Sequence, residues 1–593
     1  MKHLRWIWRF WQPHRVWLWL LLLLTLLSSA VVLVFPRVIG YLIDGVVDLE
    51  QTADAADVQR MIWQYALILA GIGVARTLAR FYPATRALLN AHIEVDVRQH
   101  YFSQIVDKGY KFFNRFRTGD LVTRLTDDIG GFPKIAWFAC SGIFRAVESL
   151  SKFLFCVAFM LTMSWKLTLL TIAPLPVMLA LFYFVRVALT KRSLERQRII
   201  STTNDALESA FSGIRILKAF RGESEQALRF RGILDRRIDI ELKLMKLWMA
   251  MHNIYLGIQF VGQIIVVVAG GMMVINGNLS LGELTAFFLY VGMMLPPMMD
   301  IPNLFVTSRT AFACIDREIE IENTPGGTEG CYEGVMPLES LEEIVLEGIA
   351  FSFDESLPAA LNDVSLRIKR GERVAVVGAV GCGKTTLVKV AAGLLPPESG
   401  TVRVNGRPLA DWDLASYRAR LGYIPQEATL FSESVTGNVL FGRELGAEDV
   451  DAALALAQVR NEMYALPEGL EQVLGQKGLS ISGGQKQRLA IARALVAGPE
   501  LLLMDDCTSS LDAENEQAFW QEFGARYPSA ACLIVTHRLA TAKQADRIYV
   551  LAQGRVVGQG THAELLQNCP EYKSFLTKEE LRSALGISSA AGS

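Results

Sequence analysis

Apolar residues gather in long stretches before about residue 310, and few charged residues interrupt them. The first stretch, residues 16–34, has 19 residues without a charge, close to the roughly 20 that a helix needs to cross a bilayer. The pattern predicts six membrane spans, in residues 16–34, 61–75, 141–162, 167–185, 255–275 and 284–299. The first is longer than the apolar core of a secretory signal and has no small-residue cleavage site after it, so we interpret it as a membrane helix.

Charges in the short loops predict the orientation of these spans. The segment before the first span is basic, with Lys2, Arg5, Arg9 and Arg15, whereas the loop after it is mainly acidic. Because positive loops stay inside, we expect a cytoplasmic N-terminus in the cell's inner (plasma) membrane. Six crossings then place the C-terminus in the cytoplasm as well. Tryptophans between the arginines of residues 1–15 favour an amphipathic helix on the inner membrane surface.

The polar segments divide the chain into domains. Residues 91–136 and 186–249 carry apolar positions at helical spacing with few breakers, so we expect membrane helices that continue into the cytosol. The membrane domain is predicted over residues 16–322, followed by a Pro- and Gly-containing linker, 323–343. Residues 344–575 alternate short β-rich runs with helical stretches, which predicts an α/β domain with a parallel sheet, and residues 576–593 form a tail.

Composition excludes several classes of function. Hydrophobic residues make up 51% of the 593 positions and charged residues only 20%, which is too apolar for a disordered chain or an ordinary soluble enzyme. Lys and Arg number 59 and Asp and Glu 60, so no basic excess predicts a nucleic-acid partner. The eight cysteines contain no CxxC pair, which argues against a disulfide scaffold or a zinc ribbon.

Two motifs predict a site for a nucleoside triphosphate. Residues 378–385 match G-x-x-x-x-G-K-[ST] after a predicted strand, 374–377, and before helix-forming residues. Lys384 is expected to reach the β- and γ-phosphates, and the Thr385 hydroxyl to hold Mg²⁺. A second apolar strand, 501–504, ends in Asp505 and Asp506, which places a carboxylate beside the metal. A third buried strand is predicted over 531–535.

A further motif gives a family resemblance. The sequence Ile-Ser-Gly-Gly-Gln at 481–485 and its continuation to residue 495 resemble an ATP-binding cassette domain. Other elements similar to that family follow in order: Phe353, Gln426, Ser509-Ser-Leu-Asp512 and His537. The membrane half resembles the same family's exporter fold, with residues 112–121 and 213–220 similar to its coupling helices and 276–283 similar to the turn before its sixth helix.

The resemblance implies roles for individual residues. Phe353 is expected to stack on adenine, Gln426 to sense Mg²⁺ and the coupling helices, and His537 to contact the γ-phosphate. The implied ATP-binding set is Phe353, Gly378, Gly381, Gly383, Lys384, Thr385, Thr386, Ser482, Gly483, Gly484 and Gln485. The implied Mg²⁺ set is Thr385, Gln426 and Asp505, and the implied catalytic set is Asp506, His537 and Gln426. In this family two cassettes enclose two ATP molecules, so one cassette per chain implies a dimer.

One position departs from the family pattern. Hydrolysing cassettes of the family carry a glutamate where this chain has Asp506, and aspartate is one methylene shorter. A displacement of about 1 Å can lower a rate on the order of 10²-fold. Asp506 followed by Cys507 is similar to the impaired chain of heterodimeric multidrug-type exporters. A heterodimer with a glutamate-containing partner is therefore the favoured interpretation, and a slow homodimer remains the alternative.

The membrane half offers candidate cargo residues. Arg145, Glu148 and Lys152 fall on one helical face, and charges at membrane depth are expected to face the protein interior or a wet cavity. Asp300 is a candidate partner for cationic cargo, and Gln259 and Gln263 lie one helical turn apart. Each has a structural alternative: an internal ion-pair ladder for the charged residues and interhelical hydrogen bonds for the glutamines.

The sequence thus predicts a six-span α-helical membrane domain followed by an α/β ATP-binding cassette. The predicted function is half of an ATP-driven exporter of amphipathic small molecules, lipids or peptides, working with a second half-transporter in contact with membrane lipids. Two alternatives remain open from the sequence: an importer of a metal chelate on the same fold, and an ATP-binding regulatory subunit that moves no cargo.

Overall fold

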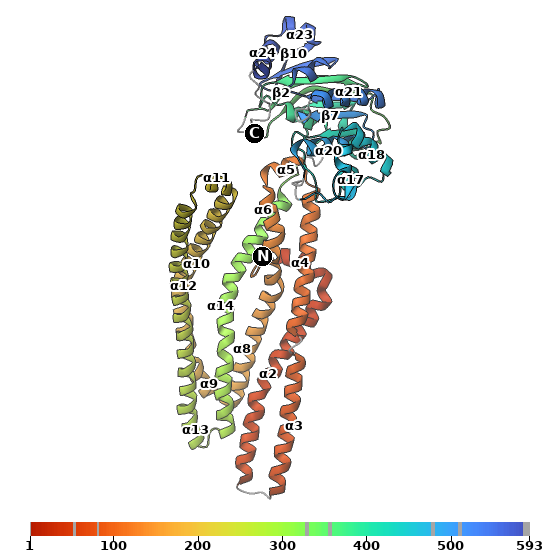
Figure 1. Ribbon diagram of the computed structural model, residues 1–593. Coiled ribbons are helices and arrows are strands. Elements are labelled where there is room, and N and C mark those ends of the chain that lie inside the picture. The colour runs from red at the N-terminus through yellow and green to blue at the C-terminus, as the bar shows by residue number, and fades with distance from the viewer. Residues whose placement is uncertain are drawn as a thin grey trace. The chain divides into compact units, whose positions relative to one another are not determined.

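The computed structural model describes residues 2–50, 55–79, 82–326, 331–353, 358–475, 481–507 and 513–584. It divides into two compact units (Figure 1). A helical unit contains Met1–Phe102 and Val122–Ile321, and an α/β unit contains Ser103–Leu121 and Glu322–Ser593. Along the sequence, the division between the units falls close to the predicted boundary at residue 322, but the α/β unit also includes a stretch from within the membrane half. Ser509, Ser510, Leu511 and Asp512 and the end of the predicted tail lie outside the described residues.

The helical unit is built from long helices joined by short ones. Its elements are α1 (Lys2–Trp11), η1 (Gln12–His14), α2 (Arg15–Glu50), α3 (Ala55–Ala79), α4 (Tyr82–Val106), η2 (Arg124–Asp128), α7 (Ile135–Trp137), η3 (Phe138–Gly142), α8 (Ile143–Met163), α9 (Trp165–Ile172), α10 (Leu175–Ser212), α11 (Ile214–Ala219), α12 (Glu223–Ile265), η4 (Val266–Gly270), α13 (Gly271–Ile275) and α14 (Leu281–Asn323). Between α4 and η2 lie α5 (Tyr110–Arg115) and α6 (Thr118–Thr123). The short helices α5 and α11 occur where the resemblance predicts coupling helices.

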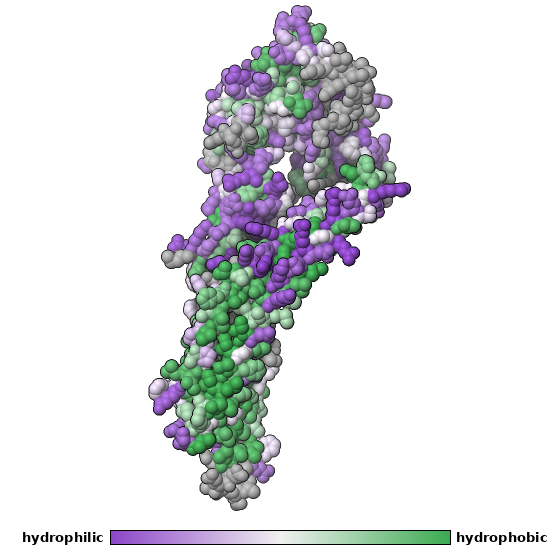
Figure 2. Space-filling model, turned by 90° about the vertical axis from the view of Figure 1, so that its left-hand side faces the viewer, coloured by the Kyte–Doolittle hydropathy of each residue, from purple (hydrophilic) through white to green (hydrophobic). Residues whose placement is uncertain are grey.

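Four of the six predicted spans appear as helical segments long and apolar enough to cross a membrane, namely Lys2–Val47, Ile62–Val106, Ile135–Met163 and Glu223–Ile275. The fourth and sixth predicted spans correspond to the shorter apolar segments Trp165–Val177 and Leu281–Met294 among the described residues. The fourth is not one continuous helix, because α9 ends before Pro174 and α10 begins after it. Figure 2 shows apolar side chains gathered over a large part of this unit.

Polar side chains within the apolar helices find partners nearby. The Thr25 hydroxyl donates to the Leu21 carbonyl at 2.7 Å, and the Ser29 hydroxyl donates to the Thr25 carbonyl at 2.9 Å. Ser151 on α8 donates to the Ser29 hydroxyl at 3.1 Å. These bonds satisfy buried hydroxyls that lipid could not hydrogen-bond, and they join α2 to α8.

A carboxylate from α2 closes the turn that precedes α14. The Asp44 carboxylate accepts from the Gly282 backbone N–H at 2.7 Å and from the Ser280 hydroxyl at 2.6 Å. A Cβ on Gly282 would lie 1.9 Å from the Gly40 carbonyl oxygen, so the two helices approach so closely only because this residue is glycine. The negative side chain also stabilises the positive N-terminal end of α14.

The N-terminal helix α1 packs its apolar face against protein. Trp6 donates from its indole nitrogen to the Tyr101 hydroxyl of α4 at 2.8 Å, and the His3 ring stacks on Phe312 of α14 at 4.5 Å. Trp8 is exposed on another face of the helix. The helix is amphipathic, as its sequence predicts, and its location at the membrane surface stays a prediction.

The α/β unit contains two sheets. Its strands are β1 (Glu343–Phe351), β2 (Leu361–Lys369), β3 (Arg373–Gly378), β4 (Ser399–Val404), β5 (Arg407–Pro408), β6 (Leu421–Ile424), β7 (Leu501–Asp505), β8 (Ala531–Val535), β9 (Arg547–Ala552) and β10 (Arg555–Gly560). The larger sheet has the order β10-β9-β3-β8-β7-β6 and is parallel from β9 to β6, which confirms the predicted parallel sheet. The antiparallel sheet β2-β1-β4-β5 was not predicted.

Helices surround these sheets and complete the core. They are α15 (Lys384–Ala391), η5 (Leu409–Asp411), α16 (Leu414–Ala419), α17 (Val435–Leu440), α18 (Ala447–Leu456), α19 (Arg460–Tyr464), η6 (Gly469–Glu471), α20 (Gly483–Leu495), α21 (Ala513–Arg526), α22 (Leu539–Lys543), α23 (His562–Asn568) and α24 (Pro570–Ala584). The central strands β7 and β8 are buried at every position, as expected for strands covered on both faces. Their fully apolar runs are therefore what made them recognisable in the sequence.

Candidate functional site

The predicted ATP-site residues follow the carboxyl ends of neighbouring parallel strands. β3 ends at Gly378, β7 at Asp505 and β8 at Val535. Asp505 pairs with Val535 in the sheet, and Ile424 at the end of β6 pairs with Met504. Ligands of open α/β sheets bind in the crevice at this edge. The fold therefore brings motifs that lie more than 100 residues apart to one place.

The phosphate loop connects β3 to α15 through positions that favour glycine. Gly378, Gly381 and Gly383 all have positive φ values, and Gly383, at φ 104°, precedes the first residue of α15. A Cβ on Gly383 would lie 2.3 Å from the Ala360 carbonyl oxygen. The loop can thus adopt its path only with glycine at this position, and it leaves the N-terminal amides of α15 available to an anion.

The Lys384 side chain folds back onto the phosphate loop, where it is expected to help bind phosphate. Its ammonium donates to the Gly378 carbonyl at 2.9 Å and to the Ala379 carbonyl at 2.8 Å, and it is 3.8 Å from the Cys382 sulfur. Burial lowers the pKa of Lys384, because desolvation disfavours the charged form. An entering phosphate would supply the negative charge that this buried ammonium lacks.

Thr385 and Asp505 meet where the sequence predicts Mg²⁺. The Thr385 hydroxyl donates to the Asp505 carboxylate at 3.1 Å, and burial raises the pKa of Asp505. A hydroxyl and a carboxylate at this distance fit Mg²⁺, which prefers few protein oxygens together with substrate phosphates. No group of three or more His, Cys, Asp or Glu residues that could hold a metal occurs in the described part of the chain. Thr386, the next residue, is buried in α15.

Asp506 lies at the strand end with an unusual backbone. Its φ is 49°, in the left-handed region, and its backbone N–H donates to the Val535 carbonyl at 2.9 Å. Burial is the main cause that raises the pKa of Asp506 to about 6, while a hydrogen bond from the His537 backbone lowers it. The Asp506 carboxylate thus lies within hydrogen-bond reach of the His537 backbone, and the roles of the two residues at a phosphate stay predictions.

The other predicted ATP-site residues lie at exposed positions. Gln426 is exposed two residues after β6, and Phe353 is 41% exposed two residues after β1, with its ring against Phe351 at 5.0 Å. An exposed aromatic ring before the phosphate loop suits stacking on a base.

The signature residues cap the helix α20. Ser482 accepts from the Gln485 backbone N–H at 3.2 Å, and the Gln485 side chain accepts from the Ser482 backbone N–H at 2.9 Å. Ser482 and Gly483 are exposed, and Gly484 is half-buried. The capping box leaves the positive end of α20 open to solvent, where an anion from another molecule can reach it.

The short helix α5 contacts the phosphate-loop helix. The Lys389 ammonium of α15 donates to the Tyr110 hydroxyl at 2.9 Å and lies 4.5 Å from the centre of that ring. Lys111 pairs with Glu398 at 3.9 Å. Sequence reasoning identified the coupling segment but missed Tyr110 and Lys389, because neither belongs to a recognisable motif.

The predicted cargo residues converge on one cavity of about 460 Å³ in the helical unit. Arg145, Glu148, Lys152 and Asp300 all line it, together with residues of α2 and α4. Gln259 and Gln263 are not among the lining residues, although the Gln259 amide nitrogen lies 3.9 Å from where a Cβ of the lining Gly292 would be.

Two further lining residues, Tyr82 and Arg86, were not predicted. The Tyr82 hydroxyl donates to the Glu148 carboxylate, and Arg86 donates to the Tyr82 hydroxyl at 2.9 Å. Lys152 donates to Glu148 at 2.6 Å, so part of the ion-pair ladder considered from the sequence is present. One sequence feature could have indicated this part of the cavity: Arg86 is a lone arginine among mainly apolar residues.

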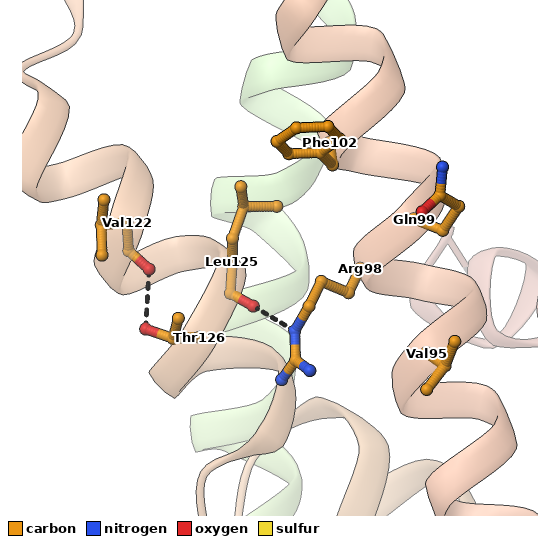
Figure 3. Close-up of a pocket in the computed structure, with 7 residues that line it drawn as sticks. All are labelled: Val95, Arg98, Gln99, Phe102, Val122, Leu125 and Thr126. Carbon is orange, nitrogen blue, oxygen red and sulfur yellow. Dashed lines mark hydrogen bonds between the residues drawn. The ribbon is translucent and has the colours of Figure 1, made fainter. Parts of the chain in front are cut away.

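A second pocket of about 340 Å³ lies between α4 and the α6–η2 segment (Figure 3). Its walls are mainly apolar, with Val95, Phe102, Val122 and Leu125 among the lining residues. Arg98 donates to the Leu125 carbonyl at 3.0 Å and pairs with Glu94 at 2.7 Å. The charged group of this pocket is thus already engaged within the protein, which distinguishes it from the larger cavity.

Comparisons with known proteins identify a family for each of the two units. The family model "ABC transporter transmembrane region" matches residues 18–298, and the model "ABC transporter" matches residues 361–509. The chain is 33% identical over 486 residues to the probable multidrug resistance ABC transporter ATP-binding/permease protein YheI of Bacillus subtilis, covering 80% of each chain.

Other relatives cover more of the chain. The multidrug resistance-like ATP-binding protein MdlA of Escherichia coli is 28% identical over 585 residues, which is 98% of this chain and 96% of that protein. The ATP-dependent lipid A-core flippase of Cupriavidus metallidurans is 29% identical over 521 residues, 85% of each chain. The fold is similar to a bacterial Atm1-family ABC exporter with ATP bound, with a TM-score of 0.80 and 22% identity over 95% of this chain and 99% of that one.

Proposed function

Because this chain belongs to the ABC transporter family, we propose that it is one half of an ATP-driven exporter of amphipathic small molecules, lipids or peptides. The protein is an ATP-hydrolysing transporter with a multi-pass helical membrane domain followed by an ATP-binding domain. The observation that carries the proposal is the meeting of the phosphate loop, Asp505, Asp506 and His537 at one sheet edge, in a chain whose other unit encloses a charged cavity.

In the proposed cycle the chain's own residues bind and orient ATP. The phosphate-loop amides and Lys384 would hold the phosphates, while Thr385 and Asp505 would hold Mg²⁺ with help from Gln426. Bound Mg²⁺ would neutralise charge on the phosphate oxygens. Asp506 orients the attacking water and His537 the γ-phosphate. Closure of the ATP sites would reach the helical unit through α5 and α11.

The proposed partner is a second half-transporter whose ATP site is completed by Ser482 and the Gly483 and Gly484 amides. Support comes from the exposed, capped start of α20, which suits a phosphate from another chain. Asp506 in place of glutamate supports a slow site in this chain and a faster site that contains the partner's glutamate. We therefore propose a heterodimer.

The known relatives support export. YheI and MdlA are described in terms of multidrug resistance, and the Cupriavidus protein as a lipid flippase. Neither a metal-chelate importer nor a regulatory subunit is favoured by any observation on the described residues.

Inside-out membrane vesicles test the function. Vesicles containing the chain and its partner should accumulate amphipathic probe compounds when MgATP is supplied, and should not do so with a non-hydrolysable analogue. ATP binding without any flux across a broad probe set would favour the regulatory alternative. Flux out of the vesicle lumen would favour import.

Two variants test the asymmetry of the ATP sites. Ser482→Arg places bulk against the γ-phosphate of the partner's site and should nearly abolish hydrolysis. Removing a hydrogen-bond donor directed at the reacting group lowers a rate on the order of 10²–10³-fold. Lys384→Ala affects the slow site and should leave a substantial fraction of the activity. Both are measured on the same co-expressed dimer at saturating MgATP. Equal collapse in the two variants would support a homodimer with equivalent sites.

A further inference from the structure

The 460 Å³ cavity of the helical unit contains charges of both signs, and their contacts differ. Glu148 has both carboxylate oxygens engaged. Lys152 donates to one oxygen at 2.6 Å, while the Tyr82 hydroxyl donates to the other, which also lies 3.9 Å from Arg86. The negative charge of Glu148 is therefore shared between two cations of the protein itself, and it is not available to a ligand.

Asp300, on α14, has a different environment in the same cavity. Its carboxylate accepts a hydrogen bond from Ser149, a buried serine of α8, at 3.0 Å. Among the described residues no cation lies within ion-pair distance, 4.0 Å, of this carboxylate. The pairing of Asp300 with a basic residue of the same cavity, considered from the sequence, is therefore not observed. A neutral hydroxyl orients the carboxylate but leaves its charge uncompensated.

Arg145 is a positive charge of the same cavity that also lacks an ion-pair partner among the described residues. It lines the same cavity, it is exposed, and within the described part of the chain no carboxylate pairs with it. A cation and an anion that the protein leaves uncompensated thus share one cavity. A ligand with only one charge would satisfy one of them and bring its apolar tail close to the other, which disfavours binding.

We propose that this cavity binds the headgroup of a zwitterionic amphiphile, with Arg145 facing the acidic group and Asp300 facing the basic group. The proposal rests on the proposed function, because it names the class of cargo for the same transport pathway. The apolar side chains Val32, Leu33 and Met293 line the remaining wall and suit the start of an acyl or alkyl chain. The cavity volume lies within the range of about 300–1,000 Å³ that is usual for small-molecule sites.

Four surfactants with the same dodecyl chain provide the test. They are dodecylphosphocholine, which is zwitterionic, dodecyltrimethylammonium, dodecyl phosphate and the uncharged dodecyl maltoside. Binding is measured by calorimetry without ATP, on the purified dimer in digitonin micelles, with the heat of protein-free micelles subtracted. The wild-type dimer should bind the zwitterion at least about 10-fold more tightly than either singly charged probe, because only the zwitterion compensates both charges.

Two variants identify the residues behind this preference. Asp300→Asn should weaken binding of the zwitterion and the cation but not of the anion, whereas Arg145→Gln should weaken binding of the zwitterion and the anion but not of the cation. Asp239→Asn and Arg229→Gln remove the same groups from exposed positions of α12 and should leave the order of the four probes unchanged.

The binding assay separates this inference from the proposed function. Equal binding of the zwitterion and the cation by the wild-type dimer would overturn the inference and leave Asp300 as a site for cations. A preference that survives both cavity variants would overturn it as well. The wild-type comparison needs no variant, so it decides the matter even if a variant does not fold. Failure of ATP-driven flux in vesicles, with the binding pattern intact, would instead refute transport.

Discussion

Removing the hydroxyl of Tyr110 should lower the free energy needed to open the α5 segment locally within the α/β unit. In Tyr110→Phe the 2.9 Å hydrogen bond from the Lys389 ammonium is lost, while the ring that lies 4.5 Å from this ammonium remains. A hydrogen bond to a charged group contributes about 1.5–3 kcal/mol. Lys389 is only partly buried and can recover water, so we expect a cost of about 1–2 kcal/mol.

This cost can be measured as local opening. Amide hydrogen exchange of α5, followed by mass spectrometry on the dimer, should become roughly 5- to 30-fold faster in Tyr110→Phe, because about 1.4 kcal/mol corresponds to a tenfold change. Tyr110→Ala also removes the cation–π contact and should raise the factor to roughly 10- to 100-fold. The amount of cargo moved per ATP hydrolysed should fall in the same order.

A matched variant controls for the substitution itself. Tyr464→Phe removes the hydroxyl of an exposed tyrosine that donates to Asp451 at 3.1 Å, and it should not change exchange in α5. Lys389→Met removes both the hydrogen bond and the cation–π contact, so its effect should be close to that of Tyr110→Ala. Adding Tyr110→Phe to Lys389→Met should change exchange little further, because the hydrogen bond is already lost. Unchanged exchange in both single variants would show that this contact does not hold the segment.

Three further predictions concern the ATP site. Gly383→Ala should abolish nucleotide binding at this chain's own site, and so remove one of the dimer's two sites in a fluorescent-ATP titration, because its Cβ would meet a carbonyl at 2.3 Å. Gly381→Ala, with nothing within 4 Å of its Cβ, should only weaken binding at that site through backbone strain of about 1–2 kcal/mol, and equal loss in the two variants would contradict this. Thr385→Val removes the hydroxyl 3.1 Å from Asp505 and should raise the Mg²⁺ concentration needed for half-maximal ATP binding at this chain's own site by roughly 10-fold, and an unchanged Mg²⁺ requirement would exclude the hydroxyl as a ligand. Asp506→Glu should raise ATP turnover of the dimer by creating a second competent site; a lower rate would indicate that the left-handed backbone at φ 49° tolerates aspartate better than glutamate.

The sequence predicts those parts of the fold in which one strong local pattern decides the structure. β7 and β8 are buried at every position, so their apolar runs stand out in the sequence. The aspartates at the end of β7 were recognised from the residues themselves, whereas the role of His537 after β8 followed from the resemblance. The antiparallel sheet was missed because β1 alternates buried and half-buried positions with a bulge near Gly348, a pattern too weak to recognise alone. The break between α9 and α10 at Pro174 was missed because absence of charge was the only criterion used for a span.

The candidate cavity was predictable only in part. The spacing of Glu148 and Lys152 places them one helical turn apart, and this pair is present. The contact of Tyr82 with Glu148 joins residues 66 positions apart on different helices, and no periodicity within one helix can indicate it. The same limit applies to the contact of Ser149 with Asp300. Helical spacing shows which residues share a face, but only the packing of the helices decides which faces meet.

The α/β unit takes in residues 103–121 from the middle of the membrane half as well as everything after residue 321. The polypeptide therefore passes between the two units three times, at residues 102–103, 121–122 and 321–322. A single linker would make the ATPase an interchangeable module, to be cut at one point and replaced by that of a relative. Here a graft made only at residue 322 would leave α5 facing a foreign surface without its lysine partner. Functional chimaeras, and recombination between genes during evolution, should thus succeed only when residues 103–121 travel with the cassette to which they belong.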